Sequence, residues 1–179
     1  MKIWHDVKPG TRESINVIVE IPRGSHNKYE LDKETGLIKL DRANYGPAPY
    51  PVEYGFIQKT LAEHGDPMDV LLFSTFPIHP GVLVSMRPVA FMEMIDGGEV
   101  DNKIIGVPVD DHRWDDVKDL PDLNKHSLRE IQDFFENLKA LKNKPVEILI
   151  KGFKGKKEAE KAFEEGLKLY AEKYSQGAK

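Results

Sequence analysis

The spacing of the apolar residues changes once along this chain, about two thirds of the way to its end. Before that point, short β-branched segments alternate with turns rich in Gly, Pro and Asp, which is typical of strands joined by tight connections. After it, apolar residues recur at helical spacing. A run of strands followed by helices predicts an α+β fold, in which two main peripheral helices pack against a small twisted barrel.

The strands are expected where β-branched residues cluster. The turn sequence at 32–36 predicts a hairpin between the strands on either side of it. Pro47, Pro49 and Pro51 predict an extended loop over 41–54, because proline cannot donate to the ladder of a central strand. The predicted strands are 15–21, 29–31, 37–40, 70–73, 82–94, 103–109 and 146–150.

Two helices are expected in the last third of the chain. Ser127 and Glu130 have the spacing of a capping box, and Pro145 closes the first helical region. A second helix is predicted over 156–174, with one apolar face. No repeat or linker divides the sequence, so we expect a single domain over 1–174 and a loose tail at 175–179. The first helix is marked by Leu128, Ile131, Phe134, Phe135, Leu138 and Leu141.

Charge and composition exclude several classes of function. The formal net charge of −4 argues against a general nucleic-acid binder, although bound metal ions could still attract an anionic substrate. The absence of cysteine excludes disulfides, a thiol nucleophile and a thiolate-ligated metal. No stretch resembles a signal peptide or a membrane span, so we expect a cytoplasmic protein.

Two acidic loops are the strongest candidates for chemistry. In the first, Asp66 and Asp69 lie three residues apart beside a Gly and a Pro, an arrangement suited to a hard divalent cation. The second runs from Asp96 to Asp101 and ends two residues before Lys103. Taken alone, each loop is more often a solvated turn or a hairpin connection than a metal site.

Further polar residues precede these loops. Lys28, Tyr29 and Glu30 alternate at the start of a predicted strand, so Lys28 and Glu30 face the same side. By themselves they would be an ordinary surface pair, and the tyrosines at 50 and 54 would be packing residues.

The combination of these segments resembles the family I soluble inorganic pyrophosphatases of the prokaryotic type, over nearly the whole chain. The order and spacing of the matches are specific. The matching segments are Glu20-Ile21-Pro22, Lys28 to Gly36, Leu40-Asp41-Arg42, Tyr50-Pro51 with Tyr54-Gly55, Gly65-Asp66-Pro67 with Asp69-Val70, Arg87-Pro88-Val89, Met94 with Asp96, Asp101 with Lys103, Val107-Pro108, and Phe134-Phe135 followed by Lys139.

The resemblance implies a five-stranded, OB-like β-barrel and hydrolysis of pyrophosphate to two phosphates by metal-activated water. It implies that Asp66 is the general base, and that Glu30 and Tyr50 support the residues that touch metal or substrate. The implied metal ligands are Asp69, Asp101, Asp96 and Glu20. The implied ligands of the phosphoryl oxygens are Lys28, Arg42, Tyr54, Lys103 and Lys139. A homo-oligomer, with a hexamer as the expected assembly, is implied as well.

The sequence departs from the family pattern at three positions. His64 stands where the pattern has a metal-binding aspartate. Imidazole is a poor ligand for Mg²⁺ and a better one for Mn²⁺ or Co²⁺, so the expected Mg²⁺ could be replaced by these ions; alternatively, His64 points to solvent. Gly97 replaces an acidic residue, and Glu99 is near enough to substitute. Leu138 replaces a tyrosine and cannot donate a hydrogen bond to phosphate.

Two alternatives remain open at this point. The chain could be a catalytically weakened relative with an altered metal preference or a binding role, which the departures at His64 and Leu138 favour. It could also bind single-stranded nucleic acid, as OB-like barrels often do, but the acidic pI of about 5.9 disfavours that reading.

Overall fold

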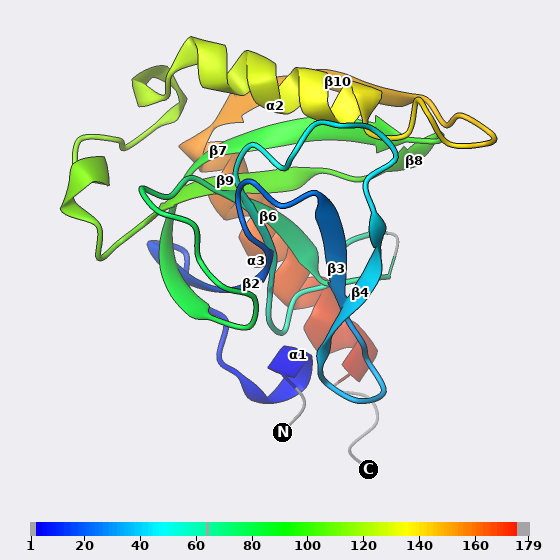
Figure 1. Ribbon diagram of the computed structural model, residues 1–179. Coiled ribbons are helices and arrows are strands. Elements are labelled where there is room, and N and C mark those ends of the chain that lie inside the picture. The colour runs from blue at the N-terminus through cyan, green and yellow to red at the C-terminus, as the bar shows by residue number, and fades with distance from the viewer. Residues whose placement is uncertain (1–2, 64, 175–179) are drawn as a thin grey trace.

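The computed structural model describes residues 3–63 and 65–174, and within them five strands close a barrel (Figure 1). Around the barrel, each strand pairs with the next, and β2 closes the ring by pairing with β7. All the pairings are antiparallel except that of β6 with β9. The predicted α+β, OB-like barrel is confirmed. In ring order the strands are β2 (Ser14–Ile21), β5 (Glu53–Ile57), β6 (Met68–Leu72), β9 (Lys103–Pro108) and β7 (Leu83–Asp96).

The longest strand, β7, extends beyond the barrel. Its first residues pair with β2, whereas its last residues pair with β10 (Ile148–Gly155) and with the short β8 (Glu99–Val100). This extension places Asp96 at the end of β7, away from the closed part of the ring. A further two-residue strand, β1 (Gly10–Thr11), pairs with the start of β2.

The predicted hairpin is confirmed as a separate two-stranded sheet beside the barrel (Figure 1). It consists of β3 (Asn27–Leu31) and β4 (Ile38–Ala43), and β3 contacts β2. Its register sets Lys28 opposite Arg42. Two cations that are 14 positions apart in the sequence are therefore neighbours.

Alternate residues of the barrel strands bury against different helices, as the two-residue period of a strand requires. Leu71 and Ile105 belong to the cluster that includes the apolar side chains of α2 (Lys125–Asn137). Val70 and Ile104 belong to the cluster that includes Phe163 and other residues of α3 (Lys156–Tyr174). The two predicted helices thus cover two sides of one barrel. The described residues also form α1 (Ile3–Asp6) and 3₁₀ turns at His112–Trp114 and Leu120–Asp122.

The predicted capping box of the first helix is wrong. The cap is Asn124, whose side-chain oxygen accepts hydrogen bonds from the backbone N–H groups of His126 and Ser127 at 2.8 and 3.3 Å. Asparagine caps a helix as well as serine does, and it lies three residues earlier. The helix also ends earlier than its apolar pattern, at Asn137, so that Lys139 lies in the turn that follows.

The predicted loop over 41–54 is too long, because β5 begins at Glu53 and was not predicted as a strand. Glu53 is fully buried, which no strand pattern anticipates for a carboxylate. Its oxygens accept hydrogen bonds from Ser74 Oγ at 2.6 Å, from the Arg23 N–H at 2.7 Å and from the Ile78 N–H at 3.2 Å. These distant donors stabilise a polar residue at a core position of the barrel. The expectation for 175–179 lies outside the described residues.

Gly55 is needed because β2 and β5 approach closely there. A Cβ at Gly55 would lie 2.2 Å from the backbone oxygen of Ile18, closer than any real contact. We expect Gly55→Ala to lower the free energy of unfolding by about 2–3 kcal/mol, since the strands must move apart. Urea unfolding measures the change. Gly46→Ala is the control, because a Cβ at Gly46 meets nothing within 4 Å; equal losses in both variants would contradict the steric explanation.

Candidate active site

Two adjoining cavities lie where the barrel faces the β3–β4 hairpin and the turn after α2. Their volumes are about 620 Å³ and 170 Å³. Every predicted site residue that the structure describes lines one or both of them; His64 lies outside the described residues. The larger cavity is lined by Glu20, Lys28, Glu30, Tyr54, Asp66, Asp69, Asp96, Asp101 and Lys139. The smaller one shares Lys28, Tyr54, Asp96, Asp101 and Lys139 with it and adds Arg42, Tyr50 and Lys103.

Lys103 connects the two acidic loops. Its Nζ lies 2.6 Å from Asp69 Oδ2 and 2.5 Å from Asp101 Oδ1. The parallel register of β6 and β9 sets Asp69 directly beside Lys103. The Lys103 side chain is 1% exposed. Burial lowers the pKa of Lys103, but the charges and hydrogen bonds of the two carboxylates more than offset this effect, so the pKa is raised overall. It therefore remains an ammonium group, which holds both carboxylates in place.

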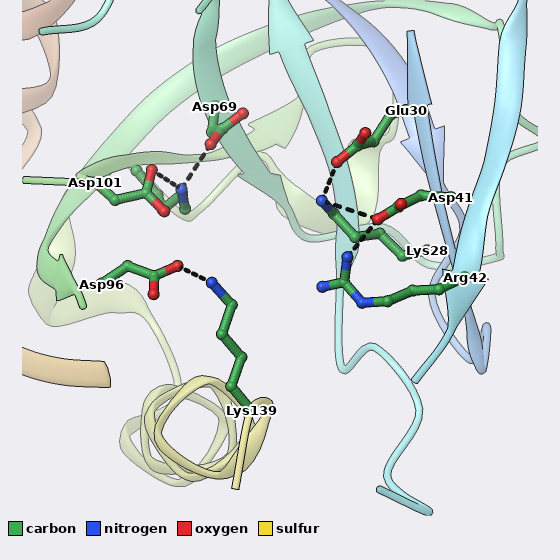
Figure 2. Close-up of polar contacts among 9 residues, drawn as sticks. Lys28, Glu30, Asp41, Arg42, Asp69, Asp96, Asp101 and Lys139 are labelled. Carbon is green, nitrogen blue, oxygen red and sulfur yellow. Dashed lines mark hydrogen bonds and ion pairs between the residues drawn. The ribbon is translucent and has the colours of Figure 1, made fainter. Parts of the chain in front are cut away.

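The same pairing of lysine with carboxylate recurs across the cavity (Figure 2). Lys139 reaches from the turn after α2 to Asp96, with its Nζ 2.5 Å from Oδ2. On the hairpin, Lys28 pairs with Glu30 and lies 3.5 Å from Asp41. Figure 2 shows Asp69, Asp96 and Asp101 on one side and Lys28 with Arg42 on the other.

Sequence reasoning missed further residues of the cavity region, among them Lys33 and Asp41. Lys33 lines the larger cavity and pairs with Asp66, and both side chains are half exposed. Asp41 pairs with Arg42. Lys33 lies in the 32–36 segment, whose composition indicates only a turn, so no local signal connects it with Asp66, which is 33 positions away.

Buried groups next to the carboxylates have strongly shifted pKa values. Burial, together with the charge of Asp69, raises the pKa of Glu20 to about 8, although Glu20 accepts a hydrogen bond of 2.7 Å from the Leu31 N–H. Burial also raises the pKa of Tyr54 well above its usual value, helped by the charges of Asp69 and Asp101. Tyr54 is therefore a neutral hydroxyl that can donate a hydrogen bond.

Tyr50 packs beneath these groups. Its ring centre is 4.7 Å from that of Phe134 and 6.0 Å from that of Tyr54. Burial raises the pKa of Tyr50 as well, so it too remains neutral. The packing of Tyr50 against α2 and Tyr54 fixes the floor of the smaller cavity.

The donor atoms of the site fit a hard divalent cation. They are carboxylate oxygens, which Mg²⁺ and Mn²⁺ prefer. Among residues 3–63 and 65–174, no three acidic or histidine side chains converge closely enough to hold an ion as they stand. The ammonium group of Lys103 lies between Asp69 and Asp101 and occupies one oxygen of each carboxylate. No helix within the described residues is long and apolar enough to cross a membrane.

Comparison with known proteins gives consistent matches. The family model for inorganic pyrophosphatase matches residues 17–171. An inorganic pyrophosphatase of Geobacillus stearothermophilus is 46% identical over 158 residues, which cover 88% of this chain and 94% of the relative. A soluble inorganic pyrophosphatase of Arabidopsis thaliana is 45% identical over 171 residues, covering 94% and 80%.

Solved structures agree with these sequence matches. The crystal structure of an inorganic pyrophosphatase from Thermus thermophilus superposes with a TM-score of 0.91 at 40% identity, covering 95% of this chain and 99% of that one. An inorganic pyrophosphatase from Helicobacter pylori gives a TM-score of 0.88 at 39% identity, covering 92% and 98%.

Proposed function

Because this chain belongs to the inorganic pyrophosphatase family, we propose that it hydrolyses inorganic pyrophosphate to two phosphates in the two adjoining cavities. The observation that carries the proposal is the convergence of Asp69 and Asp101 on one buried position, now filled by the Lys103 ammonium group. A cation at that position and a lysine beside it are what a substrate with several negative charges requires.

Divalent cations bound by Asp69, Asp101, Asp96 and Glu20 would neutralise the phosphoryl oxygens and lower the pKa of a coordinated water. The lysines that pair with these carboxylates would then be free to donate to the phosphoryl oxygens. Support comes from Lys103 and Lys139, whose ammonium groups already lie at the proposed metal ligands. Each lysine exchanges one oxygen partner for another, so no charge is left buried without a partner.

Asp66 accepts a proton from the attacking water in this proposal. Gly65, at φ 90°, and Pro67 fix the turn on either side of it. The carboxylate is half exposed and lines the larger cavity, so water can reach it. Lys28, Arg42 and the neutral Tyr54 hydroxyl donate to the phosphoryl oxygens.

The assay that tests the function measures phosphate release from pyrophosphate and from ATP, with Mg²⁺, Mn²⁺ or Co²⁺ and with a chelator. We expect release from pyrophosphate that requires a divalent cation and greatly exceeds release from ATP. No release with any of the three ions would support the binding-protein alternative, whereas turnover that persists in the chelator would contradict the requirement for a metal. The family match favours hydrolysis over that alternative.

We expect His64 to change which divalent cation gives the highest turnover, because imidazole and carboxylate prefer different metal ions. We expect His64→Asp to raise turnover with Mg²⁺ by about tenfold, the lower end of what a change beside a metal ligand produces. With Mn²⁺ or Co²⁺ the two proteins should differ less, since imidazole binds these ions well. Steady-state turnover of both proteins with each ion measures this. Equal Mg²⁺ turnover would show that His64 does not contact the metal.

Self-association and a cytoplasmic location are part of the same proposal. The hexamer is expected from the family resemblance, and sedimentation velocity of the purified chain tests it. A monomer at micromolar concentration would contradict it.

A further inference from the structure

The smaller cavity is lined by five cationic side chains, of which four already have carboxylate partners. The partners of Lys28, Arg42, Lys103 and Lys139 are the acidic residues described above. Within residues 3–63 and 65–174, the fifth, Lys142, has no ion pair or side-chain hydrogen bond. Its positive charge is therefore available without breaking an existing contact.

The turn after α2 holds Lys142 beside Lys139. The Lys142 N–H donates to the Lys139 carbonyl at 3.3 Å, and the Ala140 N–H donates to the Asn137 carbonyl at 3.1 Å. Residues three apart in such a turn lie on the same side. Both lysines line the smaller cavity for that reason.

Part of the lining of the smaller cavity is an apolar wall. Leu138 and Ile148 contribute to it, and neither can donate a hydrogen bond. Lys139 and Lys142 of the turn line the same cavity and can donate to an anion there. Lys139 is committed to Asp96 until that contact is broken, whereas Lys142 is not.

We propose that Lys142 is a substrate-binding residue, which contacts phosphoryl oxygens at the open side of the smaller cavity. This rests on the proposed hydrolysis of pyrophosphate at the same site. A lysine that passes from water to phosphate exchanges neutral water for an oxyanion and so gains a charge-assisted hydrogen bond, whereas a paired lysine only exchanges one oxyanion for another. Lys142 contributes equally to substrate and transition state, so its effect falls on KM rather than on kcat.

Lys142→Gln tests this against a matched control, Lys144→Gln. Lys144 is exposed, lies two residues further along and lines neither cavity, but its substitution removes the same charge. We expect Lys142→Gln to raise KM for pyrophosphate about tenfold, as loss of one hydrogen bond to a charged group does, with kcat changed less than about twofold. Lys142→Arg should restore KM, and Lys144→Gln should leave it unchanged.

Calorimetric titration with inorganic phosphate and Mg²⁺ provides a second readout that does not require turnover. Weaker phosphate binding by Lys142→Gln than by Lys144→Gln supports the assignment. Equal KM values and equal phosphate affinities in the two variants would overturn it, as would a fall in kcat with KM unchanged. The two proposals can fail separately. If Lys142→Gln weakens phosphate binding but the wild-type protein releases no phosphate from pyrophosphate, the proposed hydrolysis is contradicted and Lys142 remains a phosphate-binding residue.

Discussion

Replacing Asp66 by asparagine is expected to lower kcat for pyrophosphate hydrolysis by about 10²- to 10⁴-fold, the usual contribution of a positioned general base. Asparagine has nearly the same shape but cannot accept the proton of the attacking water. The fold should be unaffected, because the Asp66 side chain is half exposed and its ion-pair partner, Lys33, is exposed as well. Phosphate release at saturating pyrophosphate and Mg²⁺ measures the change.

Two controls separate the general base from other effects of the substitution. Asp116→Asn removes the same charge from an exposed residue outside both cavities and should leave kcat unchanged. Lys33→Met breaks the ion pair but keeps the carboxylate, and we expect it to retain kcat within about tenfold, since exposed ion pairs contribute little. A loss in Lys33→Met as large as that in Asp66→Asn would assign the effect to the ion pair.

Replacing Lys103 by methionine is expected to lower the free energy of unfolding of the metal-free protein by about 3 kcal/mol. The ammonium group balances two carboxylates of the site, and its removal leaves Asp69 and Asp101 facing each other without a counter-charge. Their side chains are 19% and 22% exposed, so the expected loss is at the lower end for a buried pair. The loss corresponds to a fall in Tm of about 6–12 °C.

Divalent cations should reverse this loss, because the two carboxylates of the variant are then free to bind an ion in place of the lysine. Thermal unfolding in a chelator and in excess Mg²⁺ or Mn²⁺ measures the reversal, and stabilisation by the ion should be larger in Lys103→Met than in wild type. Lys139→Met, which breaks the more exposed pair with Asp96, should lose less. An equal loss of stability with and without cations would mean that Lys103 acts through packing alone.

The elements whose signals are local could be predicted from the sequence. The helix over 156–174 was predicted with both ends correct, since its apolar face repeats within the segment itself. The hairpin followed from the turn residues at 32–36. The predicted cap of the first helix was wrong. Asn124 and Ser127 are both good capping residues, and only the course of the preceding chain selects one of them.

Candidate site residues could be named from the sequence, but their partners could not. The order of the segments that resemble the family pointed to the acidic loops and the cations, and these do line the two cavities. Lys103 meets Asp69 only because β6 and β9 pair in parallel with that register, which no local pattern encodes. The strand that begins at Glu53 was not predicted, because the donors that stabilise this buried carboxylate come from residues 23, 74 and 78.

The sequence by itself determined most of the element types and the family, and it indicated candidate residues for binding cations and phosphate. Only the tertiary structure decided which charges neutralise one another, and that Lys142 has no partner among residues 3–63 and 65–174. The physical reason is the sequence distance over which each interaction acts. Periodicity and turn chemistry act over a few residues, whereas an ion pair forms between atoms that the closed barrel brings together from distant segments.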